Sequence, residues 1–187
     1  MNNELFEKNL EIVTKYQPDL GEYLKGLENT ASILIEQDGG HNIDLGHVNF
    51  YDGGAEDYTD KQFAQYIKKP ARVQLGWPSP LSENVWKAQT FRTELRQHYI
   101  EKGITSAPAE LDSSAAFAVV LGLGLGYHID KIFSEYDIRS IYIAEQYPEF
   151  VYHAMHIHDV GEWYEEAERR NGQFRINMGN DANQLTN

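Results

Sequence analysis

The spacing of apolar residues in the first 54 positions predicts two helices followed by a hairpin. From residue 3 to residue 27 the apolar side chains fall near one helical face, and Pro18 interrupts the pattern and begins a second short helix. Residues 32–54 contain two β-rich runs on either side of Asp38-Gly39-Gly40. Because glycine accepts a positive φ, this arrangement is typical of a β-hairpin.

The middle of the chain continues with mixed elements. We expect a short helix over residues 60–68 with Asp60 as its cap, and a strand over 71–81 that two prolines stop. A long helix over 82–102 follows and ends at Gly103. Residues 104–114 are small and polar, and they form the candidate domain boundary.

After this boundary the pattern changes to alternating buried strands and helices. Residues 117–121 are continuously apolar, which indicates a strand buried on both faces. Further elements are a helix at 127–136, a strand at 139–145, a helix from 148 to about 170 and a strand at 173–179. Strands that alternate with helices across short turns predict a right-handed parallel unit.

The predicted fold class is therefore α/β, a Rossmann-like parallel half-sheet with an N-terminal helical and β-hairpin region. The predicted domains are a helical and hairpin subdomain at residues 1–105 and a Rossmann-like βαβαβ half at residues 106–187.

Composition narrows the functional classes. The chain has 187 residues, no cysteine and a net charge of −13, and residues 1–60 hold 13 acids against three bases. The acidic balance argues against nucleic acid as a partner, because phosphate is bound by basic residues. The sequence shows no signal peptide and no membrane span, and the absence of cysteine fits a cytoplasmic protein. The acidic N-terminal face is interpreted as a solvated surface, with a basic protein partner as the alternative.

The candidate binding site is the glycine turn "LGLGLGYH". Gly122, Gly124 and Gly126 follow an apolar strand and precede a helix, and Glu145 ends the next strand, where an acid can accept hydrogen bonds from a ribose. A dinucleotide turn would have its third glycine at position 127, which is a tyrosine here. The spacing is closer to the first motif of S-adenosylmethionine-dependent methyltransferases, although Val120 replaces the acid of that motif. A cofactor loop and a tight strand-to-helix turn without ligand both remain open.

Other candidate chemistry is weaker. His153, His156 and His158 beside Asp159 could hold a metal only if the helix ended near residue 157, so surface or edge histidines are favoured and no metal site is predicted. Trp77 after the third predicted strand is interpreted as a core residue, with a ring-stacking groove as the alternative. The glutamates between 162 and 168, beside Arg169 and Arg170, are interpreted as a solvated face with local ion pairs. No nucleophile elbow, P-loop or zinc-protease motif occurs, and no catalytic residue or cofactor is predicted.

The stretch "VVLGLGLGYHIDKIFSEYDIRSIYIAEQYPEFVYHAM" resembles the N-terminal domain of the Maf proteins, the motility accessory factors. The resemblance rests on Gly122 to His128, on Glu145 and on Pro148-Glu149-Phe150. These proteins are bacterial flagellin glycosyltransferases that are thought to attach nonulosonic acids such as pseudaminic acid. The resemblance implies that the transferase core lies downstream, so we expect the protein to continue beyond residue 187.

The resemblance implies an accessory domain with flagellin or another protein as a partner, and a nucleotide-sugar donor bound by the downstream domain. Two alternatives remain, a truncated methyltransferase-like nucleotide-binding domain that uses Gly122, Gly124, Gly126 and Glu145, and a protein-interaction module.

Overall fold

The computed structural model describes residues 1–27, 30–37, 40–69, 94, 97, 98, 100–103 and 114–179. Residues 1–68 and 113–187 form one compact unit, and residues 69–112 form a second one. Three expectations fall outside the described residues and stay predictions: the strand at 71–81, the core position of Trp77, and the domain boundary between residues 105 and 106. Of the helix expected at 82–102, residues 94, 97, 98, 100, 101 and 102 are described; all are helical except residue 102, which lies in a turn.

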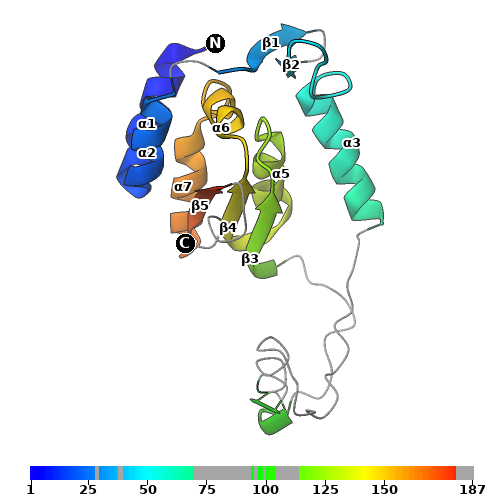
Figure 1. Ribbon diagram of the computed structural model, residues 1–187. Helices are drawn as coiled ribbons and strands as arrows, with labels where there is room; N and C mark the ends of the chain where they lie inside the picture. The colour runs from blue at the N-terminus through cyan, green and yellow to red at the C-terminus, as the bar shows by residue number, and fades with distance from the viewer. Residues whose placement is uncertain are drawn as a thin grey trace, which may run out of the picture. The chain divides into compact units, whose positions relative to one another are not determined.

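A three-stranded parallel sheet forms the centre of the first unit (Figure 1). Its strands β3 (Ser114–Leu121), β4 (Asp137–Glu145) and β5 (Phe174–Met178) lie in chain order. Helix α5 (Tyr127–Glu135) connects the first two strands, and α6 (Pro148–Ala154) and α7 (Val160–Arg169) connect the last two. The predicted α/β half-sheet is confirmed, except that the single helix expected after residue 148 is two helices.

Helices cover one face of the sheet, whereas no described residues cover the other face. The helices that connect the strands lie on one face of the sheet, where residues of α5, α6 and α7 share a core with Val120, Ile143 and Ile176. On the opposite face Phe117, Val119 and Leu121 are 60%, 59% and 84% exposed. The prediction that residues 117–121 are buried on both faces is therefore wrong for this structure.

The N-terminal helices α1 (Asn3–Tyr16) and α2 (Pro18–Lys25) form a pair, and α1 packs on α7. Asn2 caps α1 by accepting the Leu5 N–H at 3.1 Å, and Pro18 occupies the first turn of α2, as expected. The buried Asn9 side chain ties α1 to the α6–α7 turn: its amide nitrogen donates to the Met155 and His158 carbonyls, and its oxygen accepts the Val160 N–H.

Gln17, between α1 and α2, contacts the outer edge of β5. Its side-chain nitrogen donates to the Ile176 carbonyl at 3.0 Å, and its oxygen accepts the Ile176 N–H at 2.9 Å. The Tyr164 hydroxyl donates to the same oxygen at 2.9 Å. The amide of Gln17 thus makes the two hydrogen bonds that a neighbouring strand would make at this position.

The expected hairpin is confirmed as β1 (Ile33–Gln37) paired antiparallel with β2 (Gly40–Asp44). Helix α3 (Ala55–Lys68) begins earlier than the 60–68 segment suggested. The expectation that Asp60 caps this helix is wrong: Asp60 lies inside it and pairs with Lys131 of α5 at 2.7 Å. A second small core of Ile43, Tyr51, Ala55, Leu125 and Phe150 joins the hairpin region to the end of the sheet.

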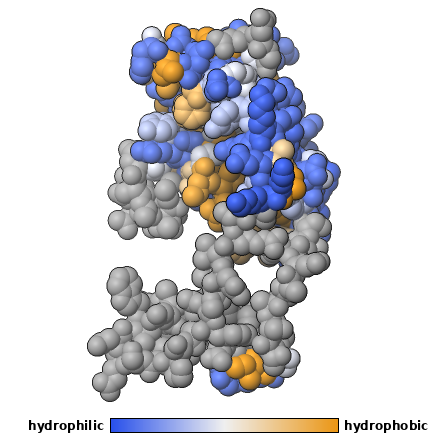
Figure 2. Space-filling model, turned by 90° about the vertical axis from the view of Figure 1, so that its right-hand side faces the viewer, coloured by the Kyte–Doolittle hydropathy of each residue, from blue (hydrophilic) through white to orange (hydrophobic). Residues whose placement is uncertain are grey.

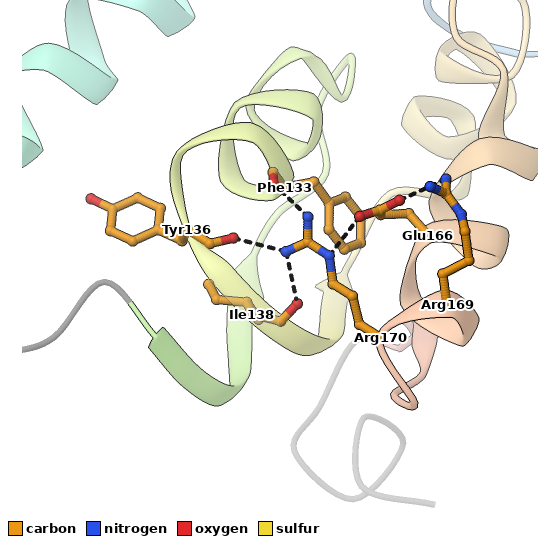
Figure 3. Close-up of polar contacts among 6 residues, drawn as sticks. All are labelled: Phe133, Tyr136, Ile138, Glu166, Arg169 and Arg170. Atoms are coloured by element: carbon orange, nitrogen blue, oxygen red, sulfur yellow. Dashed lines mark hydrogen bonds and ion pairs between the residues drawn. The ribbon is translucent and has the colours of Figure 1, made fainter.

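The arginines after α7 differ in their surroundings (Figure 3). Both pair with Glu166 at 2.6 Å, as the predicted local ion pairs require. Arg169 is largely exposed, whereas the Arg170 guanidinium lies over the Phe133 ring and donates to the carbonyls of Phe133, Tyr136 and Ile138. Arg170 therefore satisfies carbonyl groups at the end of α5 and the start of β4, and it is not part of a solvated face.

Most of the residues that Figure 2 colours by hydropathy are hydrophilic, and the apolar ones lie in separate patches. Among the described residues, none of the helices has the length and apolarity needed to cross a bilayer.

Candidate functional site

The predicted glycine turn joins β3 to α5 at the carboxyl end of the sheet. Gly122, Gly124 and Gly126 have φ values of +87°, +52° and +87°, which are backbone conformations that favour glycine. Gly126 is the residue before the first turn of α5, and a β-carbon there would lie 2.8 Å from the Trp163 ring. Strand, turn and helix are therefore arranged as in nucleotide-binding half-sheets.

Glu145 lies under this turn and is only 2% exposed. One of its carboxylate oxygens accepts the Leu123 N–H at 2.6 Å and the Gly124 N–H at 3.3 Å. The other accepts the Tyr147 N–H at 2.8 Å. The carboxylate therefore accepts the backbone N–H groups that, in the glycine turns of nucleotide-binding proteins, bind the phosphate of a ligand. A role in ribose binding stays a prediction, and it would require these bonds to be exchanged.

Tyr51, from the loop after the hairpin, contacts the glycine turn through its side-chain hydroxyl. Its hydroxyl accepts the Leu125 N–H at 2.8 Å, and a β-carbon on Gly124 would collide with the same hydroxyl. Asn42 fixes Tyr51 in this position, because its side chain bonds both the N–H and the carbonyl of Tyr51 at 3.0 Å. Burial raises the pKa of Tyr51 to about 12, with the Glu145 charge adding to the effect, so its hydroxyl is protonated near neutral pH.

All backbone N–H groups of the turn from 122 to 126 have partners within the chain. In addition to the three donors just described, the Gly122 N–H donates to the Ala144 carbonyl at 2.8 Å and the Gly126 N–H to the Leu123 carbonyl at 2.9 Å. A phosphate at this turn would have to replace bonds that already exist. The geometry therefore favours a structural turn over an open phosphate cradle.

The histidines considered for metal binding do not converge. His153 lies 3.0 Å from the Ser32 hydroxyl, His156 donates to the Asn2 carbonyl at 3.1 Å, and His158 lies 3.2 Å from Asp130. Burial lowers the pKa of both His153 and His156. In the part of the chain that the structure describes, no group of three or more histidine, cysteine or acidic side chains is placed to hold a metal ion.

His128, in the first turn of α5, is a half-buried imidazole. Burial, followed by the proximity of His158, lowers its pKa to about 4, although Asp130 opposes the shift. The imidazole is therefore neutral at physiological pH.

Ser32, His153 and Glu149 bring a hydroxyl, an imidazole and a carboxylate together, but not in the order of a catalytic triad. Glu149 accepts the N–H groups of Ala31 and Ser32, each at 2.9 Å, and also the Ser32 hydroxyl. In a triad the carboxylate would orient the imidazole instead. Burial alone would raise the pKa of Glu149, but the hydrogen bonds from Ser32 and Ala31 lower it below the usual value. The cluster anchors the start of the hairpin on α6.

The comparisons with known proteins identify the family. The family model described as the glycosyltransferase Maf N-terminal domain matches residues 5–187. The chain belongs to this family. A solved structure, that of a Maf glycosyltransferase from Magnetospirillum magneticum AMB-1, is similar over 98% of the chain, with 21% identity and a TM-score of 0.65. This chain spans only 28% of that one. The search of curated proteins gave no match.

The residues on which the Maf resemblance rests now have physical roles. Gly124 leaves space for Tyr51, Glu145 binds the turn, Glu149 anchors residues 31 and 32, and Phe150 lies in the second core. Gly124, Glu149 and Phe150 join the hairpin region of this Maf domain to the carboxyl end of the sheet, and Glu145 holds the glycine turn on β4. Sequence reasoning missed Tyr51 and Asn42, which no motif marks, and the Pro148-Glu149-Phe150 stretch was the available signal for Glu149.

Proposed function

We propose that this chain is the non-catalytic accessory domain of a Maf glycosyltransferase. The enzyme would act in the bacterial cytoplasm and transfer a nonulosonic acid, of the pseudaminic-acid type, to serine or threonine residues of flagellin. A different domain would bind the nucleotide-sugar donor and carry out the transfer. Family membership supports the glycosyltransferase context.

One observation carries the assignment of an accessory role. The glycine turn, which is the nucleotide-binding element of such half-sheets, is occupied by Glu145 and Tyr51. A domain that used this turn for a donor would need free backbone N–H groups to meet the phosphates. The same occupancy disfavours the methyltransferase-like alternative, because the acid that would hold the ribose is already bonded to the turn.

The transfer reaction can be tested by intact-mass measurement of flagellin. Flagellin and the activated nonulosonic acid are incubated with the purified chain, and separately with a complete Maf protein that contains it. We expect flagellin to gain the mass of the sugar only with the complete protein. Transfer by the chain alone would refute the accessory role, and no transfer by either would refute the proposed substrate pair.

The occupied turn can be tested separately by ligand binding. The chain is titrated with S-adenosylmethionine and with the nucleotide-sugar donor while its melting temperature is measured. A ligand that binds the folded state would raise its melting temperature. Because the turn is already occupied by Glu145 and Tyr51, we expect neither compound to bind and the melting temperature to stay unchanged. A concentration-dependent rise with S-adenosylmethionine that Glu145→Gln removes would establish the methyltransferase-like alternative instead.

A further inference from the structure

A row of five aromatic rings runs along the carboxyl end of the sheet. Tyr58, Tyr51, Phe50, Phe150 and Tyr147 form this aromatic row in that order, and the successive ring centroids are 5.5, 4.9, 4.8 and 5.4 Å apart. Tyr51 and Phe150 are buried, whereas Tyr58, Phe50 and Tyr147 are 41%, 46% and 54% exposed. The three exposed rings are therefore linked through the two buried ones into one continuous row of ring contacts.

The buried members hold the row in a fixed position. Tyr51 is bonded through its backbone to Asn42 and through its hydroxyl to Leu125. Phe150 belongs to α6, next to the anchoring Glu149. Aromatic rings fixed in this way lose little conformational freedom when a partner binds, and exposed tyrosines are frequent among the residues that dominate binding energy.

The segment of the chain that carries Phe50, Tyr51 and Tyr58 is acidic. From Gly26 to Asp60 the sequence has eight acidic residues and no lysine or arginine. Asp52 directly follows Tyr51, and Glu56 and Asp57 lie in the first turn of α3, which also carries Tyr58. Asp57 pairs with Lys61 at 2.7 Å, whereas neither Asp52 nor Glu56 forms an ion pair with another described residue. Nucleic acids and anionic lipid surfaces would be repelled here.

We propose that the aromatic row is the docking surface for a protein segment that carries lysine or arginine between apolar side chains. The apolar side chains would pack on Phe50 and Tyr147, and the cations would lie over the tyrosine faces and next to Asp52 and Glu56. The inference goes beyond the proposed function, because it does not require the partner to be flagellin and does not depend on glycosyl transfer.

The experiment selects peptides from a random library displayed on phage, using the whole chain as bait. Binding of the most enriched peptide is then measured by fluorescence anisotropy at low and at high salt, for the wild type and three variants. Tyr147→Ser removes an exposed ring, and serine suits this position because residue 147 is the N-cap of α6. Asp52→Asn removes a rim charge. Tyr23→Ser removes a ring of similar exposure, 52%, on α2 and serves as the control.

We expect enriched peptides that combine basic and apolar residues. Their affinity should fall about tenfold or more with Tyr147→Ser and remain unchanged with Tyr23→Ser. Asp52→Asn should weaken binding less and reduce its salt dependence. Failure to enrich peptides, enrichment of peptides without basic residues, or binding that Tyr147→Ser does not change would overturn the proposal. Sedimentation of the chain alone provides a further test, because a dimer that Tyr147→Ser dissociates would assign the row to a second copy of this chain.

Discussion

Replacing Glu145 with glutamine tests whether the carboxylate holds the glycine turn together. The substitution keeps the size of the side chain but replaces one of two accepting oxygens with an N–H donor group. The new group would face the N–H of Tyr147 or those of Leu123 and Gly124, which now donate to the carboxylate. A hydrogen bond to a charged group contributes about 1.5–3 kcal/mol, and a buried donor without acceptor costs about 1–3 kcal/mol.

These contributions overlap, so we expect Glu145→Gln to lower the free energy of unfolding by about 2–4 kcal/mol. For a chain of this length each kcal/mol corresponds to a shift in melting temperature of about 2–4 °C. Urea unfolding gives the free energy, and amide hydrogen exchange gives a local readout at Leu123 and Gly124, whose protection should decrease first. Glu135→Gln, at the exposed end of α5, is the control, with an expected effect below about 0.5 kcal/mol. If Glu145→Gln unfolds like the control and the two amides keep their protection, the structural role of the carboxylate is refuted.

Three further predictions use other parts of the unit. Gly124→Ala should destabilise the domain by about 2 kcal/mol or more in urea unfolding, because the new methyl group meets the Tyr51 hydroxyl at a positive φ; the double variant with Tyr51→Phe should recover part of the loss if that contact is the cause. His128 has a lowered pKa of about 4 in the folded state, so the unfolded chain binds more protons between about pH 6.5 and 4 and stability falls as the pH falls through this window. His128→Gln should flatten this part of the curve of unfolding free energy against pH. Gln17→Leu should cost about 2 kcal/mol in thermal or urea unfolding, because the N–H and carbonyl of Ile176 lose their partners; a variant as stable as the wild type would show that water replaces the amide fully.

The sequence predicted the elements of the half-sheet because their apolar spacing and turn residues are local signals. The turn from Gly122 to Gly126 is an example, since its glycines and flanking apolar runs lie within a few residues of each other. The occupants of the turn could not be predicted in the same way. Tyr51 is 74 residues away from Leu125, and a single tyrosine in a loop has no pattern that names its partner. The burial of β3 was also misjudged, because an apolar run does not indicate how many faces of a sheet are covered.

The contact of Gln17 with β5 determines which edge of the sheet can accept a further strand. Ile176 lies in the middle of its strand, and its outward N–H and carbonyl are already occupied, so a new strand cannot pair along β5 without displacing the glutamine. Among the described residues, β3 pairs only with β4, so its outer edge is where another strand can be added. A strand from another domain or a neighbouring molecule would therefore enlarge this sheet next to β3. Loss of the glutamine would leave a second edge strand with unpaired backbone groups, and that edge could also pair with another molecule and aggregate.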